Sequence, residues 1–317
     1  RAYDIWTDRY TPSDLFFLNN GELYSISTLH NNASFIGSAG PLNQGENILS
    51  VGKDNDNDGL FHFHAKIGDR LYFSNDNGVS WSDKGELPSY TFSRNSFNGS
   101  YNNQNLVAIG GIDLYRTLNN GNNWEIINNW WEYYGDPSIY LHADIPEVKF
   151  IRNNNGHELT FISTDGGLYI SSDGIMEQVN NLSLDGLGVS QYYSTYTKRT
   201  PPYQIFAGSQ DQGFQRSTDH TNSVYDFEQV ISGDYGHLVS SDSGHSIWTV
   251  YPGFAMYYPD ASTNTSGITW DFQMNGSLWL PPLTEDPYDP SSVYLGGGGL
   301  TGGHHIIKLT RSGNSIQ

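Results

Sequence analysis

Four aspartates could act in pairs as general acid and base. They are Asp144, Asp165, Asp211 and Asp234. Glycoside hydrolysis uses two carboxyl groups, and the distance between them decides whether the configuration of the sugar is retained or inverted. The alternative role is structural, because an aspartate in a turn accepts hydrogen bonds from nearby backbone N–H groups. Both interpretations stay open at the level of sequence.

Aromatic and polar residues gather around the same aspartates. Residues 130–136 read Trp-Trp-Glu-Tyr-Tyr-Gly-Asp, and residues 273–284 contain Trp279. Ring faces stack on a ligand while carboxylates and amides fix its orientation, although such rings can also fill space between sheets. The sequence predicts a ligand-binding surface made of Trp130, Trp131, Tyr133, Tyr134, Asp136, His142, Asp144, Asp165, Gln210, Asp211, Asp234, Tyr235 and Trp279.

A second candidate site is the acidic turn at 54–59. Asp54, Asp56 and Asp58 alternate ahead of Gly59, as at the start of a calcium-binding loop in which the glycine permits a sharp turn. The ninth and twelfth positions of such a loop are His62 and Ala65, so the later ligands are missing. A calcium site formed by the three aspartates is one interpretation, and a solvated acidic turn is the other.

The composition excludes several classes of protein. The 317 residues include 34 Asp and Glu but 15 Lys and Arg, a net charge of −19. Nucleic acids and anionic membranes attract basic surfaces, so we expect neither as a partner. The chain has no Cys for disulfides or thiol chemistry, and no apolar run long enough to span a bilayer. This composition favours an extracellular or bacterial cell-surface protein.

Seven similar pairs of strands recur along the chain. In each pair a β-branched or aromatic run is followed by a tight turn and a second run, such as 71–74 or 168–171. The second runs begin at residues 23, 71, 114, 168, 214, 256 and 306, in steps of 42 to 54 residues. This period and the Gly-containing turns are typical of propeller blades. We expect an all-β fold, a seven-bladed β-propeller of four-stranded antiparallel blades, as one domain over residues 1–317; a β-sandwich is the alternative.

The turn after several second runs has its own signature. Residues 74–81 read Ser-Asn-Asp-Asn-Gly-Val-Ser-Trp, a complete Asp-box, and residues 117–124 keep the pattern with Asn in place of Asp. Shortened copies begin at Ser171 and Ser217. We expect the Asp or Asn to bond backbone N–H groups of its own turn, the Gly to be left-handed and the Trp to pack between blades. Recurrence at blade spacing favours this structural role over a catalytic one.

Several segments together resemble the Asp-box (BNR) propellers. They are 142–150, 163–171, 208–213, 233–237 and 286–294. The chain is most similar to the sortilin/VPS10-like and xyloglucanase-like branch found in secreted bacterial surface proteins, and it departs from the pattern at Pro146 and Tyr235. The resemblance implies a propeller that is a sialidase, a xyloglucan hydrolase, a sorting receptor or a non-catalytic surface protein, since one fold serves many functions.

The residue inventory weighs against the first three. Sialidases clamp a substrate carboxylate with three Arg, and this chain has no Arg-Ile-Pro segment near its start. Xyloglucanase-like hydrolases place their two Asp between two propellers, and VPS10-like receptors carry a Cys-rich segment. We therefore expect a non-catalytic secreted or cell-surface propeller that binds glycan or protein, or serves as a scaffold module of a larger polypeptide. The alternative is a xyloglucanase-like or sialidase-like glycoside hydrolase that uses paired Asp carboxylates.

Propeller topology sorts the connections by face. If strands A to D run outward from the axis, B–C turns and D–A loops share one face, and A–B and C–D turns share the other. We expect the ligand-binding residues in B–C turns and D–A loops. At the C-terminus, residues 310–315 look like a degenerate C–D turn with no strand after it. Either residues 3–7 supply the missing outer strand as a latch, or the chain is part of a longer one.

Overall fold

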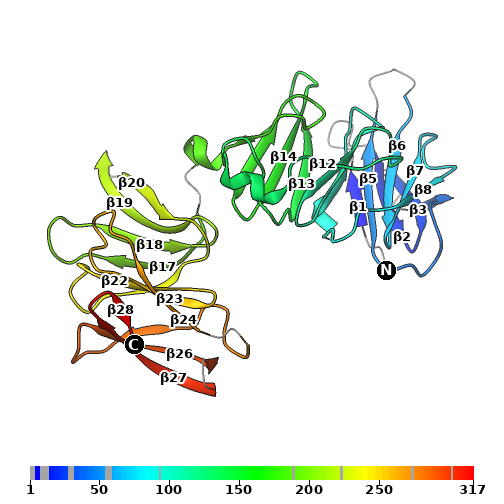
Figure 1. Ribbon diagram of the computed structural model, residues 1–317. Coiled ribbons are helices and arrows are strands. Elements are labelled where there is room, and N and C mark those ends of the chain that lie inside the picture. Colours follow the sequence, from blue (N-terminus) through cyan, green and yellow to red (C-terminus); the bar gives the residue numbers. More distant parts are fainter. Residues whose placement is uncertain are drawn as a thin grey trace. The chain divides into compact units, whose positions relative to one another are not determined.

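Seven four-stranded antiparallel sheets make up the described part of the chain in the computed structural model (Figure 1). Each sheet is built from four consecutive strands and is called a blade, numbered one to seven in chain order. The fold class is the predicted one, an all-β seven-bladed propeller. The structure describes residues 4–7, 14–27, 32–53, 59–92, 94–187, 190–221, 224–272, 275–300 and 303–317.

The first compact unit, Arg1–Gly188, holds blades one to four. The first strands of neighbouring blades in this unit are in contact, and η2 lies in the connection between blades three and four. Its elements are β1 (Asp4–Thr7), β2 (Asp14–Asn19), β3 (Glu22–Ser27), β4 (Ala33–Ser38), β5 (Asn47–Gly52), β6 (His62–Ile67), β7 (Arg70–Ser74), β8 (Ser82–Glu86), η1 (Arg94–Ser96), β9 (Phe97–Gly99), β10 (Val107–Gly110), β11 (Leu114–Thr117), β12 (Glu125–Ile126), η2 (Trp130–Tyr134), β13 (Glu147–Arg152), β14 (Glu158–Thr164), β15 (Gly167–Ser171), β16 (Asn180–Asn181) and η3 (Ser183–Leu187).

The second compact unit, Val189–Gln317, holds blades five to seven. Here too the first strands β17, β21 and β25 contact one another in order. Its strands are β17 (Tyr192–Thr197), β18 (Ile205–Ser209), β19 (Gly213–Thr221), β20 (Val224–Ile231), β21 (Gly236–Val239), β22 (Ile247–Tyr251), β23 (Phe254–Tyr258), β24 (Ile268–Asp271), β25 (Leu283–Glu285), β26 (Ser292–Leu300), β27 (His304–Ser312) and β28 (Ser315–Ile316). Across the described residues of both units, no helix has the length and apolar character needed to cross a membrane.

The predicted strand pairs are confirmed in every blade. The seven second runs lie in the third strands β3, β7, β11, β15, β19, β23 and β27, and their partner runs lie in the second strands. Burial alternates along β14 from Glu158 to Thr164, because successive side chains of a strand point to opposite faces of its sheet. The hydrophobic runs therefore identified the two middle strands of each blade.

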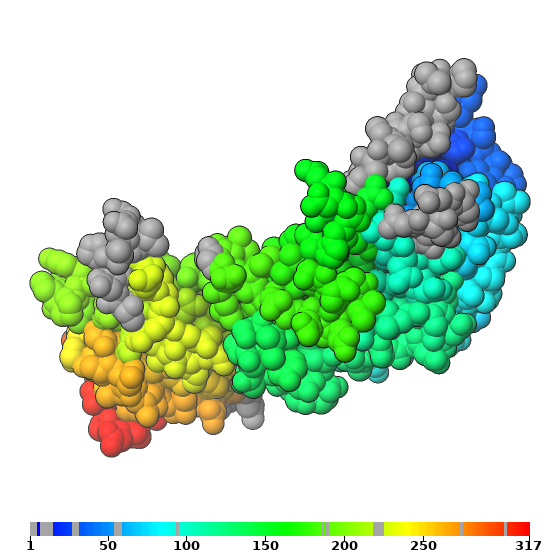
Figure 2. All heavy atoms as spheres, turned by 90° about the horizontal axis from the view of Figure 1, so that it is seen from above, coloured from blue at the N-terminus to red at the C-terminus, as the bar shows by residue number. Residues whose placement is uncertain are grey.

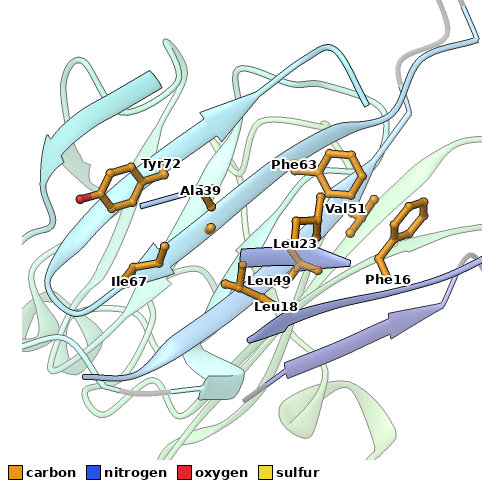
Figure 3. Packing of buried hydrophobic residues seen from close by; sticks show 10 residues of the cluster. Phe16, Leu18, Leu23, Ala39, Leu49, Val51, Phe63, Ile67 and Tyr72 are labelled. Carbon is orange, nitrogen blue, oxygen red and sulfur yellow. The ribbon is translucent and has the colours of Figure 1, made fainter. Parts of the chain in front are cut away.

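Apolar side chains from adjacent blades form the cores. Figure 3 shows the core between blades one and two, where Phe16 and Leu23 of blade one lie beside Phe63 of blade two. The rings of Phe16 and Phe63 meet edge to face with centroids 5.1 Å apart. Trp81 packs against the same cluster, which confirms the prediction that this Trp lies between blades. Each such side chain contributes about 2 kcal/mol of burial free energy.

The turn at 74–81 has the predicted internal hydrogen bonds. The Asp76 carboxylate accepts from the Ser80 N–H at 2.9 Å and from the Ser80 hydroxyl at 2.6 Å, and these bonds lower its pKa. Gly78, at φ +82°, donates its N–H to the Ser74 hydroxyl at 3.0 Å. The Trp81 indole N–H donates to the Gly78 carbonyl at 2.8 Å. Asp76 therefore organises its own turn.

A further copy of this turn lies at an unexpected position. Residues 240–246 read Ser-Ser-Asp-Ser-Gly-His-Ser and join β21 to β22, which makes them an A–B turn rather than a C–D turn. Asp242 accepts from the Ser246 N–H at 2.9 Å, and Gly244 donates to the Ser240 hydroxyl at 2.8 Å. The sequence carried this signal, but Ile247 stands where the Trp of the pattern would be, and Ile247 begins a second strand.

Two expectations about strand ends are wrong. Ser217 lies inside β19, which continues to Thr221 through a register shift, so no C–D turn begins at Ser217. Residues 4–7 of the predicted latch form β1, which pairs with β2 in blade one. Tyr3 lies outside the described residues. The outer strand of blade seven is β28, which pairs with β27 through Arg311 and Ser312. In both cases a local hairpin forms, β1 with β2 and β19 with β20. Pairing between strands close in sequence costs less loop-closure entropy than pairing between distant ones.

A buried carboxylate joins blades three and four. Glu158, only 7% exposed at the start of β14, accepts a hydrogen bond from the Ser100 hydroxyl at 2.5 Å. It also accepts the backbone N–H groups of Tyr101 at 2.8 Å and Asn102 at 3.2 Å. All three donors belong to the A–B turn of blade three. Burial raises the pKa of Glu158, and the three hydrogen bonds oppose that rise.

Two buried histidines lie between blades two and three. His62 and His64 project from the same face of β6, with ring centroids 5.6 Å apart. A ring nitrogen of His62 lies 3.0 Å from the Ser100 carbonyl, and one of His64 lies 3.0 Å from the Gln104 carbonyl. Burial, with the positive charge of His62 and Lys84, lowers the pKa of His64 to about 3. His64 is therefore neutral in the folded protein at physiological pH.

Candidate functional site

All the predicted ligand-binding residues lie in B–C turns or D–A loops, as the strand order shows. The first unit contributes those of the D–A loop 127–146 and of the B–C turn of blade four, namely Trp130, Trp131, Tyr133, Tyr134, Asp136, His142, Asp144 and Asp165. The second unit contributes Gln210, Asp211, Asp234, Tyr235 and Trp279.

The B–C turn of blade three is the anchor of the first group. Asp144 N–H donates to the Ile112 carbonyl at 3.0 Å, and the next residue, Ile145, donates to the Gly111 carbonyl at 2.8 Å. The Trp130 N–H donates to the Asp113 carboxylate at 2.8 Å. The loop 127–146 is thus fastened to this turn at both its ends, which fixes the position of η2.

Three rings on η2 face solvent. Trp130, Trp131 and Tyr134 are 38%, 57% and 55% exposed. The ring centroids of Trp130 and Trp131 are 5.9 Å apart and those of Trp130 and Tyr134 are 6.3 Å apart, both edge to face. Glu132 accepts the Asn129 N–H at 2.7 Å and so caps the start of η2. We call Trp130, Trp131 and Tyr134 the aromatic platform; the segment that carries it lies at the surface of its unit (Figure 2).

Tyr133 and His142 are buried beneath the aromatic platform. Their rings meet edge to face with centroids 4.6 Å apart, and the Tyr133 ring also lies 5.4 Å from the ring of Tyr134. His142 fits against Gly166, where an added Cβ would come within 2.5 Å of the His142 side chain. These two residues support the loop, whereas the platform rings present faces that a ligand could contact.

Asp136 also organises the loop. Its carboxylate accepts the Ser138 N–H at 3.0 Å and the Ser138 hydroxyl at 2.5 Å. These hydrogen bonds lower the pKa of Asp136, so it stays ionised. Asp144 takes a left-handed conformation with φ +62°, which Asp tolerates better than most residues. Both aspartates therefore have backbone roles and also place negative charge on the loop.

Sequence reasoning missed two exposed residues next to this site. Tyr90 is 84% exposed in the D–A loop between blades two and three, and Thr91 beside it bridges to Gly111. Ile112, 43% exposed, occupies the anchoring turn itself. Neither residue belongs to a recognisable motif. The sequence could have indicated them only through their positions, Tyr90 in a D–A loop and Ile112 in a B–C turn.

In the second unit, Asp211 and Asp234 are brought together. The Asp211 N–H donates to the Asp234 carboxylate at 3.2 Å, and the Asp211 carbonyl accepts the Gly233 N–H at 2.8 Å. Asp211 is left-handed, with φ +55°. The neighbouring Tyr251 has a raised pKa, chiefly through burial and further through the charges of the two aspartates. The contact joins the backbone of Asp211 to the side chain of Asp234, so it places the two residues side by side.

Tyr235 is buried in the core of the second unit, with 2% of its surface exposed. Its ring lies 5.2 Å from that of Tyr251 and 6.2 Å from that of Phe254. Trp279 is half exposed and meets Tyr193 of β17 edge to face at 6.1 Å. Trp279 therefore offers surface to a ligand in this unit, and Tyr235 packs the loop from below.

Metal ligands do not assemble within the described residues. No group of three or more His, Asp or Glu side chains lies close enough there to hold a metal ion. The predicted calcium ligands Asp54, Asp56 and Asp58 lie outside the part of the chain that the structure describes.

Comparisons with known proteins give structural similarity alone. No protein-family model and no curated protein matches the chain. Similar solved structures include a GH74 enzyme of Niastella koreensis, with 12% identity over 99% of this chain and 53% of that chain and a TM-score of 0.40. An ancestral GH74 enzyme matches at 10% identity over 100% and 57% of the two chains, with a TM-score of 0.42. YCF48 from Cyanidioschyzon merolae matches at 13% identity over 97% and 94%, with a TM-score of 0.37.

The chain thus spans just over half of the length of the two GH74 enzymes. Identities of 10 to 13% assign neither an activity nor a ligand to it.

Proposed function

We propose that this protein is a non-catalytic propeller of the Asp-box type, secreted or displayed at a cell surface, that binds glycan through the aromatic platform. The observation that carries the proposal is the exposure of three rings on one short capped helix, held by backbone hydrogen bonds to the B–C turn of blade three. Rigid aromatic residues supply contact area at little entropic cost. Polar groups of the same loop would orient the sugar hydroxyls.

Replacing Trp131 tests this proposal. Trp131→Ala removes the most exposed ring of the platform, so we expect glycan affinity to fall about tenfold while the melting temperature stays unchanged. The measurement is isothermal titration with oligosaccharides that bind the wild-type protein on a glycan array. Tyr288→Ala is the matched control, because Tyr288 is 95% exposed but lies in the A–B connection of blade seven. Equal affinities for wild type and Trp131→Ala would refute the role of the platform.

A second function, glycoside hydrolysis, is favoured by one observation: the Asp211 N–H donates to the Asp234 carboxylate, so the two aspartates are neighbours. The pair accepts backbone hydrogen bonds and lies near the half-buried Tyr251, which suits a structural role equally well. We expect no product when the protein is incubated at high concentration with xyloglucan, β-glucans and sialosides. Product formation that Asp211→Asn abolishes, in a variant that still folds, would establish the hydrolase instead.

A further inference from the structure

The loops around the aromatic platform carry negative charge without positive charge. The segments 110–113, 127–146 and 164–167 contain five carboxylates and neither Lys nor Arg. The carboxylates are those of Asp113, Glu132, Asp136, Asp144 and Asp165. Asp136 has a lowered pKa and is ionised at any physiological pH. The surface next to the exposed rings is therefore anionic.

Basic side chains on the flanking strands are already engaged. Arg116 of β11 donates to Glu125 at 2.7 Å and makes a second bond to the Ile175 carbonyl. Lys149 of β13 lies 3.5 Å from Glu147. These pairs lie within the blades themselves, so they do not neutralise the loops. An anionic ligand would be repelled at this surface and a cationic one attracted.

The rings add a second attraction for a cation. An ammonium group over an indole or phenol face gains about 0.5 to 2 kcal/mol, with Trp the best partner. Trp130 and Trp131 expose their rings within the same loop as Glu132 and Asp136. A ligand that combines a flat apolar face with a positive charge would use both features together.

The backbone of the anchoring turn favours a sugar over a peptide. The carbonyls of Gly110, Gly111 and Ile112 each accept a backbone N–H group, from Phe92, Ile145 and Asp144 respectively. The Gly111 N–H donates to the backbone carbonyl of Asp113. The turn therefore has no strand edge onto which an extended peptide could add. A ligand at this surface would therefore meet ring faces and carboxylates, both of which attract a protonated amine.

We infer that the glycan bound at the aromatic platform is cationic, a polymer or oligomer of amino sugars with free amino groups. This inference rests on the proposed glycan-binding function and names the class of its ligand. The charge of the five carboxylates and the faces of the platform rings together select such a sugar over its neutral and acidic counterparts. The selection is electrostatic and weakens with added salt.

The test compares two probes that share one sugar backbone and differ at the 2-amino group: the glucosamine hexamer, which is cationic at pH 6, and its fully N-acetylated, uncharged form, both at low salt. We expect the free amine to bind at least tenfold more tightly, with the advantage lost at high salt. Asp165→Asn should weaken binding of the amine severalfold and leave the acetylated hexamer unaffected, while Trp131→Ala weakens both. Glu177→Gln, an exposed acid in the C–D turn of blade four, is the matched control and should change nothing.

The outcomes separate this inference from the function beneath it. Equal or tighter binding of the acetylated hexamer, or an equal loss in Asp165→Asn and Glu177→Gln, overturns the charge selection but leaves glycan binding in place. Binding of a lysine-rich peptide with no binding of either hexamer overturns both the inference and the glycan-binding proposal.

Discussion

Between pH 6.5 and pH 4, the free energy of unfolding of the wild-type protein is expected to fall by about 3 kcal/mol more than that of a His64→Gln variant. The folded protein holds the pKa of His64 at about 3, because the ring is completely buried beside His62 and near Lys84. In the unfolded chain the imidazole titrates near its ordinary value of about 6.5. Below that pH the imidazole binds a proton in the unfolded state but not in the folded state, so the free energy of unfolding decreases as the pH falls.

Urea unfolding followed by tryptophan fluorescence at several pH values measures this difference. Glutamine can still donate to the Gln104 carbonyl that faces His64, but it does not titrate. His157→Gln is the control, since His157 is exposed in a turn of blade four. The prediction concerns the slope of stability against pH, so a constant destabilisation by the substitution does not affect it. Parallel curves for wild type and His64→Gln would show that His64 is protonated without cost.

Replacing Glu158 by Ala is expected to lower the free energy of unfolding by about 3 to 5 kcal/mol. The substitution leaves the Ser100 hydroxyl and the N–H groups of Tyr101 and Asn102 without their acceptor at a buried contact between blades. Glu158→Gln should cost less, about 2 kcal/mol, because its amide oxygen can still accept one or two of these hydrogen bonds.

Chemical denaturation at pH 7 measures the free energy of unfolding of both variants. The result that supports the role of Glu158 is a larger loss for Glu158→Ala than for Glu158→Gln. Glu177→Ala removes an exposed carboxylate from the same blade and should cost under about 0.5 kcal/mol. A similar small effect for Glu158→Ala would mean that water replaces the carboxylate, and the contact between blades three and four would then have another basis.

The strands were predictable because each blade repeats the same local information. A hydrophobic run, a Gly-containing turn and a second run identify a hairpin without reference to the rest of the chain. The pairing of Asp4–Thr7 was harder, since its four residues fit the edge of any sheet and only the short connection to β2 selects blade one. Ser217 shows the same limit, because a turn signature that lacks its glycine reads equally well as a continuing strand.

The candidate site was predictable as a set of loops but not residue by residue. Trp131 and Tyr133 are two positions apart on η2, yet the first faces solvent and the second is buried against His142. A five-residue helical turn has no sequence periodicity long enough to assign its inner face. Likewise, the burial of Tyr235 depends on Tyr251 of β22 and Phe254 of β23, the second and third strands of blade six.

The turns at 74–80 and 240–246 share one hydrogen-bond pattern at two different points in the blade cycle. The shared hydrogen bonds close within seven residues. The first turn also bonds outside itself, because the Asn77 side chain accepts the Phe61 N–H at 2.8 Å. The same turn can therefore join different pairs of strands, so its spacing in the sequence does not show which strands it connects. In blade six, a strand assignment based on this turn would be displaced by two strands. For protein engineering, the same property marks this heptapeptide as a graft for closing β-hairpins in unrelated sheets.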